Sequence, residues 1–239
     1  MKFTFLGTGG AFDTAYGNSA ALVEFKGKTI LLDCGFTVYP TLRQYELTRS
    51  IQYILITHLH NDHTGSLANI LLHCHYFNTN CRPVILYPDD DFRDELYEFL
   101  RLQIQKPEKY ADFMPLSELP GITALDTFGL HAERLQTYAY IFEENGERRV
   151  YSGDLGQPDI LFASLRGMPP KATTIFHDIT FSEENAGHTY YKKLIPLLQE
   201  YHIFGYHCDP TKNPEDNPLP LVYHQPELML SSLVQEAVH

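Results

Sequence analysis

The segment Thr57-His58-Leu59-His60-Asn61-Asp62-His63-Thr64-Gly65 decides how this chain is interpreted. Three histidines and one aspartate fall within six residues, directly after the short apolar run Ile51–Ile56. Such a run is typical of a strand buried on both faces, and a loop that starts where the strand ends can turn all four side chains inward. Neutral imidazoles and a carboxylate are ligands that suit zinc and similar divalent ions. The segment therefore predicts a metal site at the end of a buried strand.

The alternative interpretation is that these four polar side chains only solvate a loop. A lone histidine would favour that alternative, but a full set of ligand types at the end of a buried strand favours the metal site. Because one loop rarely supplies a whole site, further ligands are expected at other strand ends.

Three later residues meet this expectation. His131 follows the strand-like stretch Ile122–Phe128, and Asp154 comes where the second strand of a predicted hairpin ends. His207 closes a later apolar run, and we prefer it to the nearby His202 because of that place at the strand's end. Together with the first cluster, these residues predict a site with six or seven ligands, which is enough for two ions.

The rest of the chain alternates predicted strands with predicted helices. Apolar and β-branched runs between turn signals indicate strands at Lys2–Leu6, Ala20–Phe25, Thr29–Leu32, Pro83–Tyr87, Thr137–Glu143, Arg148–Ser152, Thr173–Phe176 and Ile203–Tyr206. Helices are expected at Ser66–Tyr76, Asp90–Gln105 and near Tyr190–Gln199, where Pro196 breaks or kinks the last one. Asn145-Gly146 is a strong hairpin signal, and Pro210–Pro220 is expected to be extended. With no linker or repeat in view, residues 1–239 are interpreted as one α/β (α+β) domain with mixed sheets covered by helices.

Composition and charge restrict the class of partner. The chain is 44% hydrophobic and 20% charged, which is typical of a globular protein, and its formal charge is -12 with eighteen dispersed Lys and Arg residues. Long nucleic acid is therefore disfavoured, because its binding depends on basic surfaces. No apolar run is long enough to cross a bilayer, and the glycines after Leu6 come too early for a signal peptide. Four scattered cysteines fit a reducing compartment, so a cytoplasmic location is expected.

The order of these motifs resembles the metallo-β-lactamase superfamily. The resemblance is carried by Leu6-Gly7-Thr8-Gly9-Gly10, by Leu31-Leu32-Asp33-Cys34-Gly35 and by the His-x-His-x-Asp-His pattern of the first cluster, and it extends as far as His207. A competing interpretation of the opening glycines is a dinucleotide-binding fingerprint, but the third glycine of that motif is replaced by Phe12 and a strand follows where a helix should. The resemblance implies a four-layer αββα sandwich with metals at one edge.

The same resemblance implies a role for each candidate ligand. The residues expected to hold the first ion are His58, His60 and His131. Those expected to hold the second are Asp62, His63 and His207, with Asp154 bridging both ions and Asp33 orienting a ligand histidine. The cofactors are expected to be two divalent ions, zinc first and manganese as an alternative, since histidine and aspartate alone do not rank them.

Within the superfamily, the chain is most similar to ribonuclease Z and its phosphodiesterase relatives. His177-Asp178-Ile179-Thr180-Phe181 and Gly187-His188-Thr189 resemble the His-Glu-Ala-Thr and Gly-His-Ser-Thr segments of that branch. The likeness implies that His188 protonates the leaving oxygen or contacts the phosphate, and that Asp178 orients it. Because aspartate replaces the usual glutamate, that contact is expected to be shorter or water-mediated. His177 is expected to be a satisfied buried residue.

The resemblance also restricts the class of substrate. The short connection between Asp154 and Thr173 leaves no room for the long arm with which tRNA-processing members grasp tRNA. The expected enzyme is therefore a phosphodiesterase for a small phosphodiester such as a cyclic nucleotide, with attack by metal-activated hydroxide that Asp62 and Asp154 orient. The alternatives are a ribonuclease Z-like RNA endonuclease, a thioester, lactone or β-lactam hydrolase on the same site, and a metal protein that binds without catalysis. Sixteen Tyr and fifteen Phe residues are compatible with a homodimer interface.

Overall fold

The first half of the chain forms a mixed sheet. The computed structural model describes residues 1–78, 81–167 and 169–230. The strands, in their order across this sheet, are β1 (Lys2–Gly7), β2 (Ala20–Phe25), β3 (Lys28–Leu32), β4 (Tyr53–Leu55), β5 (Val84–Tyr87) and β6 (Asp112–Pro115). Strands β1 to β3 pair antiparallel, and β3 to β6 run parallel. The strands predicted in this region are confirmed, although the buried run Ile51–Ile56 is a strand only over Tyr53–Leu55.

A second mixed sheet follows. In sequence order its strands are β7 (Ile122–Asp126), β8 (Tyr138–Glu144), β9 (Glu147–Tyr151), β10 (Thr173–Asp178) and β11 (His202–Tyr206). Strands β7 to β9 are antiparallel, and β9 to β11 are parallel. Asn145 (φ 52°) and Gly146 (φ 80°) both adopt left-handed conformations between β8 and β9. This backbone is what a two-residue hairpin turn requires, so the predicted hairpin is confirmed.

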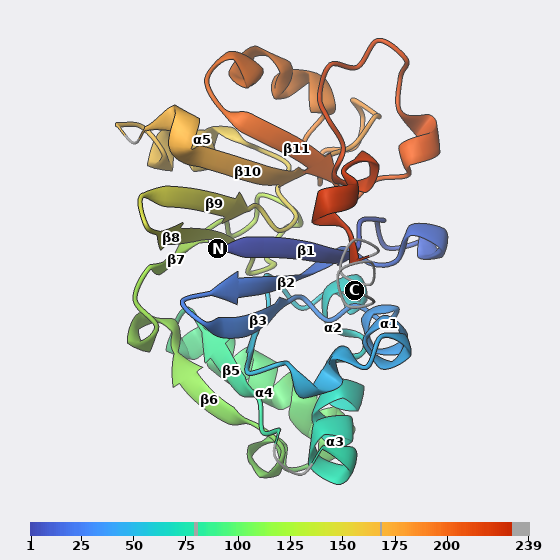
Figure 1. Cartoon of the computed structure of the whole chain (residues 1–239), viewed down its shortest axis with the longest axis vertical. Helices are drawn as coiled ribbons and strands as arrows, with labels where there is room; N and C mark the ends of the chain where they lie inside the picture. The colour runs from blue at the N-terminus through green and yellow to red at the C-terminus, as the bar shows by residue number, and fades with distance from the viewer. Residues whose placement is uncertain (79–80, 168, 231–239) are drawn as a thin grey trace, which may run out of the picture.

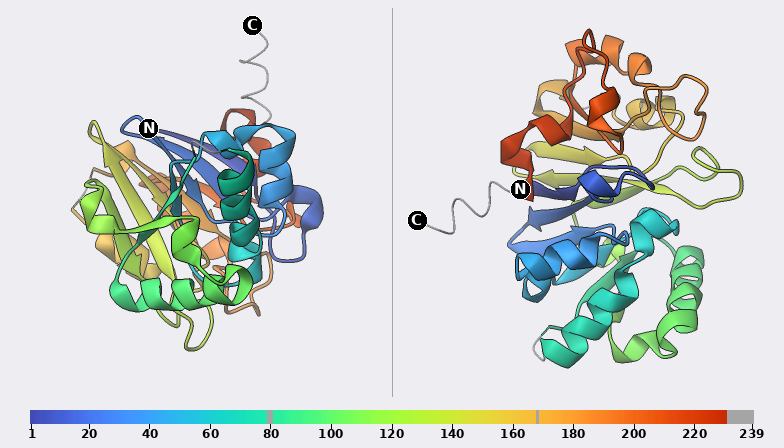
Figure 2. Two further views of the ribbon diagram at one scale, coloured as in Figure 1. Left: turned by 90° about the horizontal axis from the view of Figure 1, so that it is seen from below. Right: turned by 90° about the vertical axis from the view of Figure 1, so that its right-hand side faces the viewer.

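Helices cover the outer face of each sheet (Figures 1 and 2). The helices on the side of the first sheet are α1 (Val38–Gln44), α3 (Leu67–Phe77) and α4 (Asp90–Ile104), while α5 (Asp159–Ser164) lies over the second sheet. The right-hand view of Figure 2 shows the resulting layers, with the two sheets stacked between the helices. Helix–sheet–sheet–helix is the architecture that the resemblance to the metallo-β-lactamase superfamily implies.

Helix α4 shows how the local sequence determines an element. Asp89 precedes the helix and accepts a hydrogen bond from the backbone N–H of Phe92 at 2.9 Å, which caps the first turn. Asp90 and Asp91 follow in that turn, where carboxylates are favoured by the helix dipole. The apolar residues at helical spacing, from Phe92 to Ile104, are buried against the sheet. The predicted helix is therefore confirmed to within one residue of its expected end.

Aromatic side chains fill the space between the sheets. Phe3 and Phe5 of β1 lie 5.1 Å, between ring centroids, from Phe176 of β10, and Phe5 also packs near Tyr151 and Tyr206. All of these rings are buried. Aromatic pairs at such distances add to the free energy of burial, so this layer joins the two sheets. A second apolar cluster lies between the second sheet and α5.

The strand ends that the site uses lie at one edge. Leu32 at the end of β3 pairs with Leu55 at the end of parallel β4. In the second sheet Tyr151 at the end of β9 pairs with Phe176 of β10, and Asp178 pairs with Tyr206 at the end of β11. Because the carboxyl ends of parallel strands meet at the same edge, the residues that follow these strands are brought together.

Some of the predicted elements are wrong. The segment near Tyr190–Gln199 forms two 3₁₀ helices, η6 (Tyr191–Lys193) and η7 (Ile195–Gln199), instead of one α-helix. Pro196 lies in the first turn of the second, where its missing N–H does least harm. The segment Pro210–Pro220 is not wholly extended, because Pro210–Lys212 forms η8.

Short helices make up most of the remaining connections. They are η1 (Thr14–Tyr16), η2 (Leu47–Arg49), α2 (Asn61–Thr64), η3 (Pro107–Lys109), η4 (Leu116–Glu118), η5 (Pro170–Ala172), η9 (Val222–His224) and η10 (Pro226–Leu228). The last segment returns to the first sheet, where Met229 forms a bridge with Phe5 of β1. Within the described ranges, no helix combines the length and the apolar character needed to cross a membrane.

Candidate metal centre

The loop after β4 carries the first ligand cluster and is held tightly against β3. The backbone N–H of Thr57 donates to Oδ1 of Asp33 at 2.8 Å, and the N–H of Cys34 donates to the carbonyl of His63 at 2.7 Å. A Cβ on Gly35 would lie 2.0 Å from the carbonyl oxygen of Asp62, so only glycine allows this approach. Helix α2 then brings Asp62 and His63 inward, and both are buried.

His58, His60 and His131 form one candidate group. Each offers a ring nitrogen within 4.8 Å of the others. Nε2 of His131 lies 3.1 Å from Nδ1 of His60, while its Nδ1 donates to the carbonyl of Gly187 at 2.7 Å. This second contact fixes the orientation of the His131 ring and leaves Nε2 facing the group. The predicted ligands of the first ion therefore lie together.

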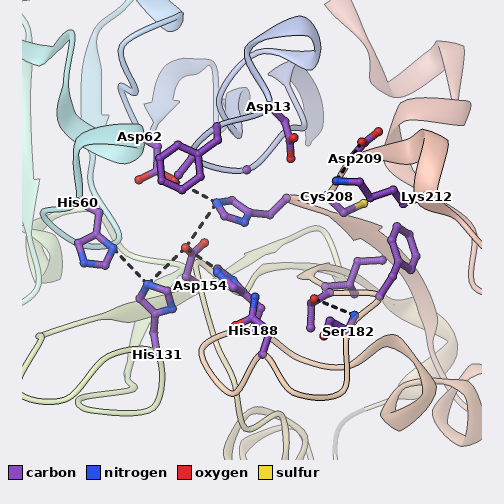
Figure 3. A pocket seen from close by; sticks show the side chains of 18 of the residues that line it. Asp13, His60, Asp62, His131, Asp154, Ser182, His188, Cys208, Asp209 and Lys212 are labelled. Carbon is purple, nitrogen blue, oxygen red and sulfur yellow. Dashed lines mark hydrogen bonds and ion pairs between the residues drawn. The ribbon is translucent and has the colours of Figure 1, made fainter.

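The second group consists of Asp62, His63, Asp154 and His207. Each offers one ligand atom, and these atoms lie within 4.8 Å of one another. Oδ2 of Asp62 lies 3.3 Å from Nε2 of His63 and 3.2 Å from Nε2 of His207. In Figure 3 the labelled side chains of His60, Asp62, His131 and Asp154 point into one space. The predicted ligands of the second ion also lie together.

Asp154 lies between the two groups. Its Oδ2 is 3.9 Å from Nε2 of His58, 3.6 Å from Nε2 of His131 and 3.5 Å from Nε2 of His207. Its Oδ1 is 3.4 Å from Nε2 of His63. The Asp154 carboxylate is therefore surrounded by ring nitrogens of both groups, which is the position expected of a bridging ligand.

The polar atoms of the site fit a metal centre. Nε2 of His58, Nε2 of His63 and Oδ1 of Asp154 are buried and have no hydrogen-bond partner within the described structure. Buried polar atoms without a partner are rare, because each costs about 1–3 kcal/mol. All three atoms face the two groups, and imidazole nitrogen and carboxylate oxygen are donors that zinc accepts. Divalent ions bound here would give these atoms their missing partners.

Burial and neighbouring charges shift the pKa values of the site. Burial lowers the pKa of His58 well below its usual value, and the nearby His63 lowers it further, so this imidazole is neutral as a ligand must be. Burial alone would raise the pKa of Asp62, but hydrogen bonds from His207 and His63 outweigh it and hold that pKa below its usual range. Both shifts favour the ligand form of the side chain.

Two residues of the site adopt backbone conformations that non-glycine residues rarely take. Asp33 has φ 59° and His207 has φ 64°. Such conformations cost about 1–3 kcal/mol and persist where surrounding contacts determine them. Each residue directly follows the last residue of a strand and turns a polar side chain toward the centre, so we attribute the strain to positioning. His202, the alternative to His207, is exposed on β11 and lies outside both candidate groups.

His188 and Asp178 lie beside the metal groups. Nδ1 of His188 is 2.8 Å from Oδ2 of the fully buried Asp178 and 3.9 Å from Oδ2 of Asp154. The contact with Asp178 is direct, so the water-mediated alternative does not apply. Burial lowers the pKa of His188, but the hydrogen bond and charge of Asp178 outweigh it and raise this pKa to about 9.

His177 only partly meets its expectation. It is fully buried, and its Nδ1 donates to the carbonyl of Asp178 at 2.8 Å, but its Nε2 has no partner within the described structure. His177 is therefore buried as expected, but its side chain does not make the full set of hydrogen bonds that we expected.

A cavity of about 1090 Å³ opens over the centre. Its wall includes His60, Asp62, His131, Asp154, His188 and His207. Residues that we did not predict also line it, among them Phe12, Asp13, Asp209 and Lys212 (Figure 3 labels the last three). The first two follow the opening glycines Gly7-Thr8-Gly9-Gly10, which carry the family resemblance, but that resemblance gave them no role.

Comparison with known proteins finds a matching family and similar sequences. The family model described as "Anti-Pycsar protein Apyc1" matches residues 1–219. The Anti-Pycsar protein Apyc1 of Paenibacillus harenae is 30% identical over 210 residues, which cover 82% of this chain and 84% of that relative.

Solved structures share the fold at lower identity. The metallo-β-lactamase fold protein YhfI from Bacillus subtilis has a TM-score of 0.69 at 18% identity and covers 90% of this chain and 89% of its own. The short form of human tRNase Z has a TM-score of 0.63 at 19% identity, and the match covers 89% of this chain and 95% of tRNase Z. These similarities confirm the predicted metallo-β-lactamase fold.

Proposed function

This chain belongs to the Anti-Pycsar protein Apyc1 family, and from that premise we propose that it is a two-metal phosphodiesterase for a small phosphodiester such as a cyclic nucleotide. The family and the fold identify the protein as a hydrolase of the metallo-β-lactamase fold.

The observation that carries the proposal is the pair His188–Asp178 beside the metal groups. Hydrolysis of a phosphodiester must protonate a leaving alkoxide, and a positioned histidine is the usual donor. Nδ1 of His188 is held by Asp178 at 2.8 Å, so the other ring nitrogen, Nε2, is left to donate to the leaving oxygen. His188 also lines the cavity, where a substrate would meet it.

The metal groups supply the rest of the chemistry. When bound, two divalent ions lower the pKa of water toward about 7 and offset charge on the phosphoryl oxygens. The residues proposed to hold them are His58, His60 and His131 for the first, and Asp62, His63 and His207 for the second, with Asp154 shared. The carboxylates of Asp62 and Asp154 orient the attacking water. Zinc is proposed, and manganese is the alternative.

The cavity favours a small substrate. Among the residues that line it in the described part of the chain, Lys212 is the only lysine or arginine, and it is paired with Asp209 at 3.4 Å. A long polyanion needs an extended basic surface, whereas one phosphodiester can be held by the ions alone. The connection between Asp154 and Thr173 contains only the short elements α5 and η5 among its described residues, which leaves little to grasp tRNA. The homodimer and the cytoplasmic location stay predictions.

A substrate screen tests the proposal. The protein, supplied separately with zinc and with manganese, is assayed against cyclic nucleotides, linear dinucleotides, a tRNA precursor, thioesters and lactones. We expect cyclic nucleotides to be cleaved fastest, and Asp62→Ala to abolish turnover while circular dichroism shows an intact fold. Asp91→Ala, an exposed carboxylate on α4, is the matched control and keeps full activity. Cleavage of thioesters or lactones without any phosphodiester cleavage would overturn the proposal.

A further inference from the structure

Phe12 has the highest exposed fraction of any large apolar side chain in the described part of the chain. Its relative exposure is 95%, compared with 77% for Leu102 and 72% for Phe77. An aromatic ring left in water contributes nothing to the hydrophobic core. Phe12 also lines the cavity over the metal centre, whereas Leu102 and Phe77 do not. Its exposure is therefore located where a ligand would cover it.

The turn that carries Phe12 is fixed by backbone hydrogen bonds. The N–H of Asp13 donates to the carbonyl of Gly10 at 3.2 Å, and the N–H of Gly9 donates to the carbonyl of Gly17 at 2.8 Å. A Cβ on Gly9 would lie 2.6 Å from the carbonyl oxygen of Asp13, so the turn is also tightly packed. The ring is thus presented on a defined backbone, and little conformational freedom is lost when a ligand binds.

The same turn adjoins the metal groups. A Cβ on Gly10 would lie 3.4 Å from Cε1 of His207, and the N–H of Cys208 donates to the carbonyl of Thr8 at 3.2 Å. Phe12 is two residues beyond Gly10, and two residues of chain span at most about 7 Å. Figure 3 shows the next residue, Asp13, on the cavity wall. A nucleotide whose phosphate is held at the metal groups is therefore long enough for its base to contact the Phe12 ring.

The other aromatic residues of the cavity are engaged elsewhere or partly buried. Phe181 packs its ring against Tyr191, with 5.6 Å between centroids in an edge-on arrangement, and Phe36 is only partly exposed. Phe12 has the free ring face.

We infer that Phe12 is a stacking platform for the nucleobase of the substrate. This inference rests on the proposed function, because it assumes that the phosphodiester lies at the metal groups. An aromatic ring stacks on any base, since every base has a π-face, and such stacking is sequence-tolerant. Phe12 therefore favours nucleotides over other phosphodiesters without choosing strongly among the bases.

A comparison of two substrates tests the inference. A nucleoside 3′,5′-cyclic monophosphate and the methyl riboside 3′,5′-cyclic phosphate, which lacks a base, are hydrolysed by the metal-loaded protein and by Phe12→Ala. For the nucleotide we expect KM to rise roughly 5- to 150-fold in the variant, as loss of one stacking contact implies, with kcat unchanged. For the base-free substrate KM should not change. The Kd of a slowly hydrolysed phosphorothioate analogue of the nucleotide should rise by the same factor.

Conservative and remote variants complete the test. Phe12→Trp should retain the wild-type KM, because it keeps an aromatic face. Phe77→Ala, which removes another exposed phenylalanine away from the cavity, should change nothing. If Phe12→Ala raises KM equally for both substrates, or for neither, the stacking role is wrong while the proposed function stands. If wild-type protein hydrolyses neither substrate, both the proposed function and the inference are overturned.

Discussion

Oδ2 of Asp33 lies 2.8 Å from Nδ1 of His63, and both side chains are fully buried. The contact joins the end of β3 to the loop after β4. It holds the His63 ring so that Nε2 faces the second metal group, and a carboxylate there also increases the basicity of the ligand nitrogen.

Asp33→Asn should weaken metal binding, because the amide cannot replace the carboxylate as acceptor for His63 and also keep its bonds to Thr57. Loss of such a supporting contact typically lowers metal affinity or activity about 10- to 100-fold. Competition with a chromogenic chelator measures the affinity. Asp94→Asn, an exposed carboxylate on α4, should leave it unchanged. Equal affinities for Asp33→Asn and wild type would contradict the proposed role.

His207→Ala should reduce the bound metal, whereas His202→Ala should not. His207 is buried within hydrogen-bond distance of Asp62, and His202 is exposed five residues earlier. The two variants remove the same side chain from neighbouring positions, so they form a matched pair. Elemental analysis of the purified proteins gives the metal content. A loss of metal in His202→Ala alone would reverse the assignment.

His188→Ala should lower kcat about 100- to 10,000-fold on a cyclic nucleotide, the range typical of a lost general acid. The metal content should stay at the wild-type level, because His188 is proposed to donate a proton to the leaving oxygen. With a p-nitrophenyl phosphodiester, whose nitrophenolate leaving group needs no proton, the variant should lose far less activity. An equal loss on both substrates would show that His188 acts in another way.

Removal of the metal should lower stability as well as activity. A ligand that binds only the folded state stabilises it by about 2.7 kcal/mol at one hundred times its Kd. Thermal unfolding after treatment with a chelator should therefore occur at a lower temperature, and restoring zinc or manganese should return both the transition and the activity. An unchanged transition would indicate that the buried ligand atoms do not hold metal.

Gly35→Ala should disturb the metal centre through the backbone. The added Cβ would overlap the carbonyl oxygen of Asp62 at 2.0 Å, and overpacking of this kind costs about 1–3 kcal/mol. We expect a lower unfolding midpoint in urea together with weaker metal binding. Gly27→Ala, at φ 71° with open space around it, should lose stability through backbone strain and keep its metal affinity.

The sequence predicts which candidate ligands lie close together in the structure, because residue type and position at strand ends coincide. Four candidate ligands fall within six residues. Asp154 and His207 follow strands of the parallel set that end at one edge, and His131 follows β7, which pairs antiparallel with β8. The resemblance to ribonuclease Z relatives adds His188 and Asp178, which the structure places 2.8 Å apart.

Other features depend on contacts that the sequence does not reveal. Strand β6 was not predicted, because four residues that end in Pro115 have no clear periodicity. The segment around Pro196 has apolar residues at helical spacing, yet it forms 3₁₀ turns, since proline removes a backbone donor. The exposure of Phe12 is a tertiary property, and a phenylalanine in a sequence is by itself more typical of a core.

The division of the strands between two sheets has a further consequence. In the described part of the chain, β1 to β6 end at Pro115 and β7 begins at Ile122, so the strands pass from one sheet to the other only there. Four of the seven proposed ligands precede this crossing and three follow it. A protein cut between Pro115 and Ile122 would consist of two fragments, each with an incomplete set of the proposed ligands. The aromatic layer between the sheets would bring the fragments together, and only the reassembled pair would contain all seven proposed ligands.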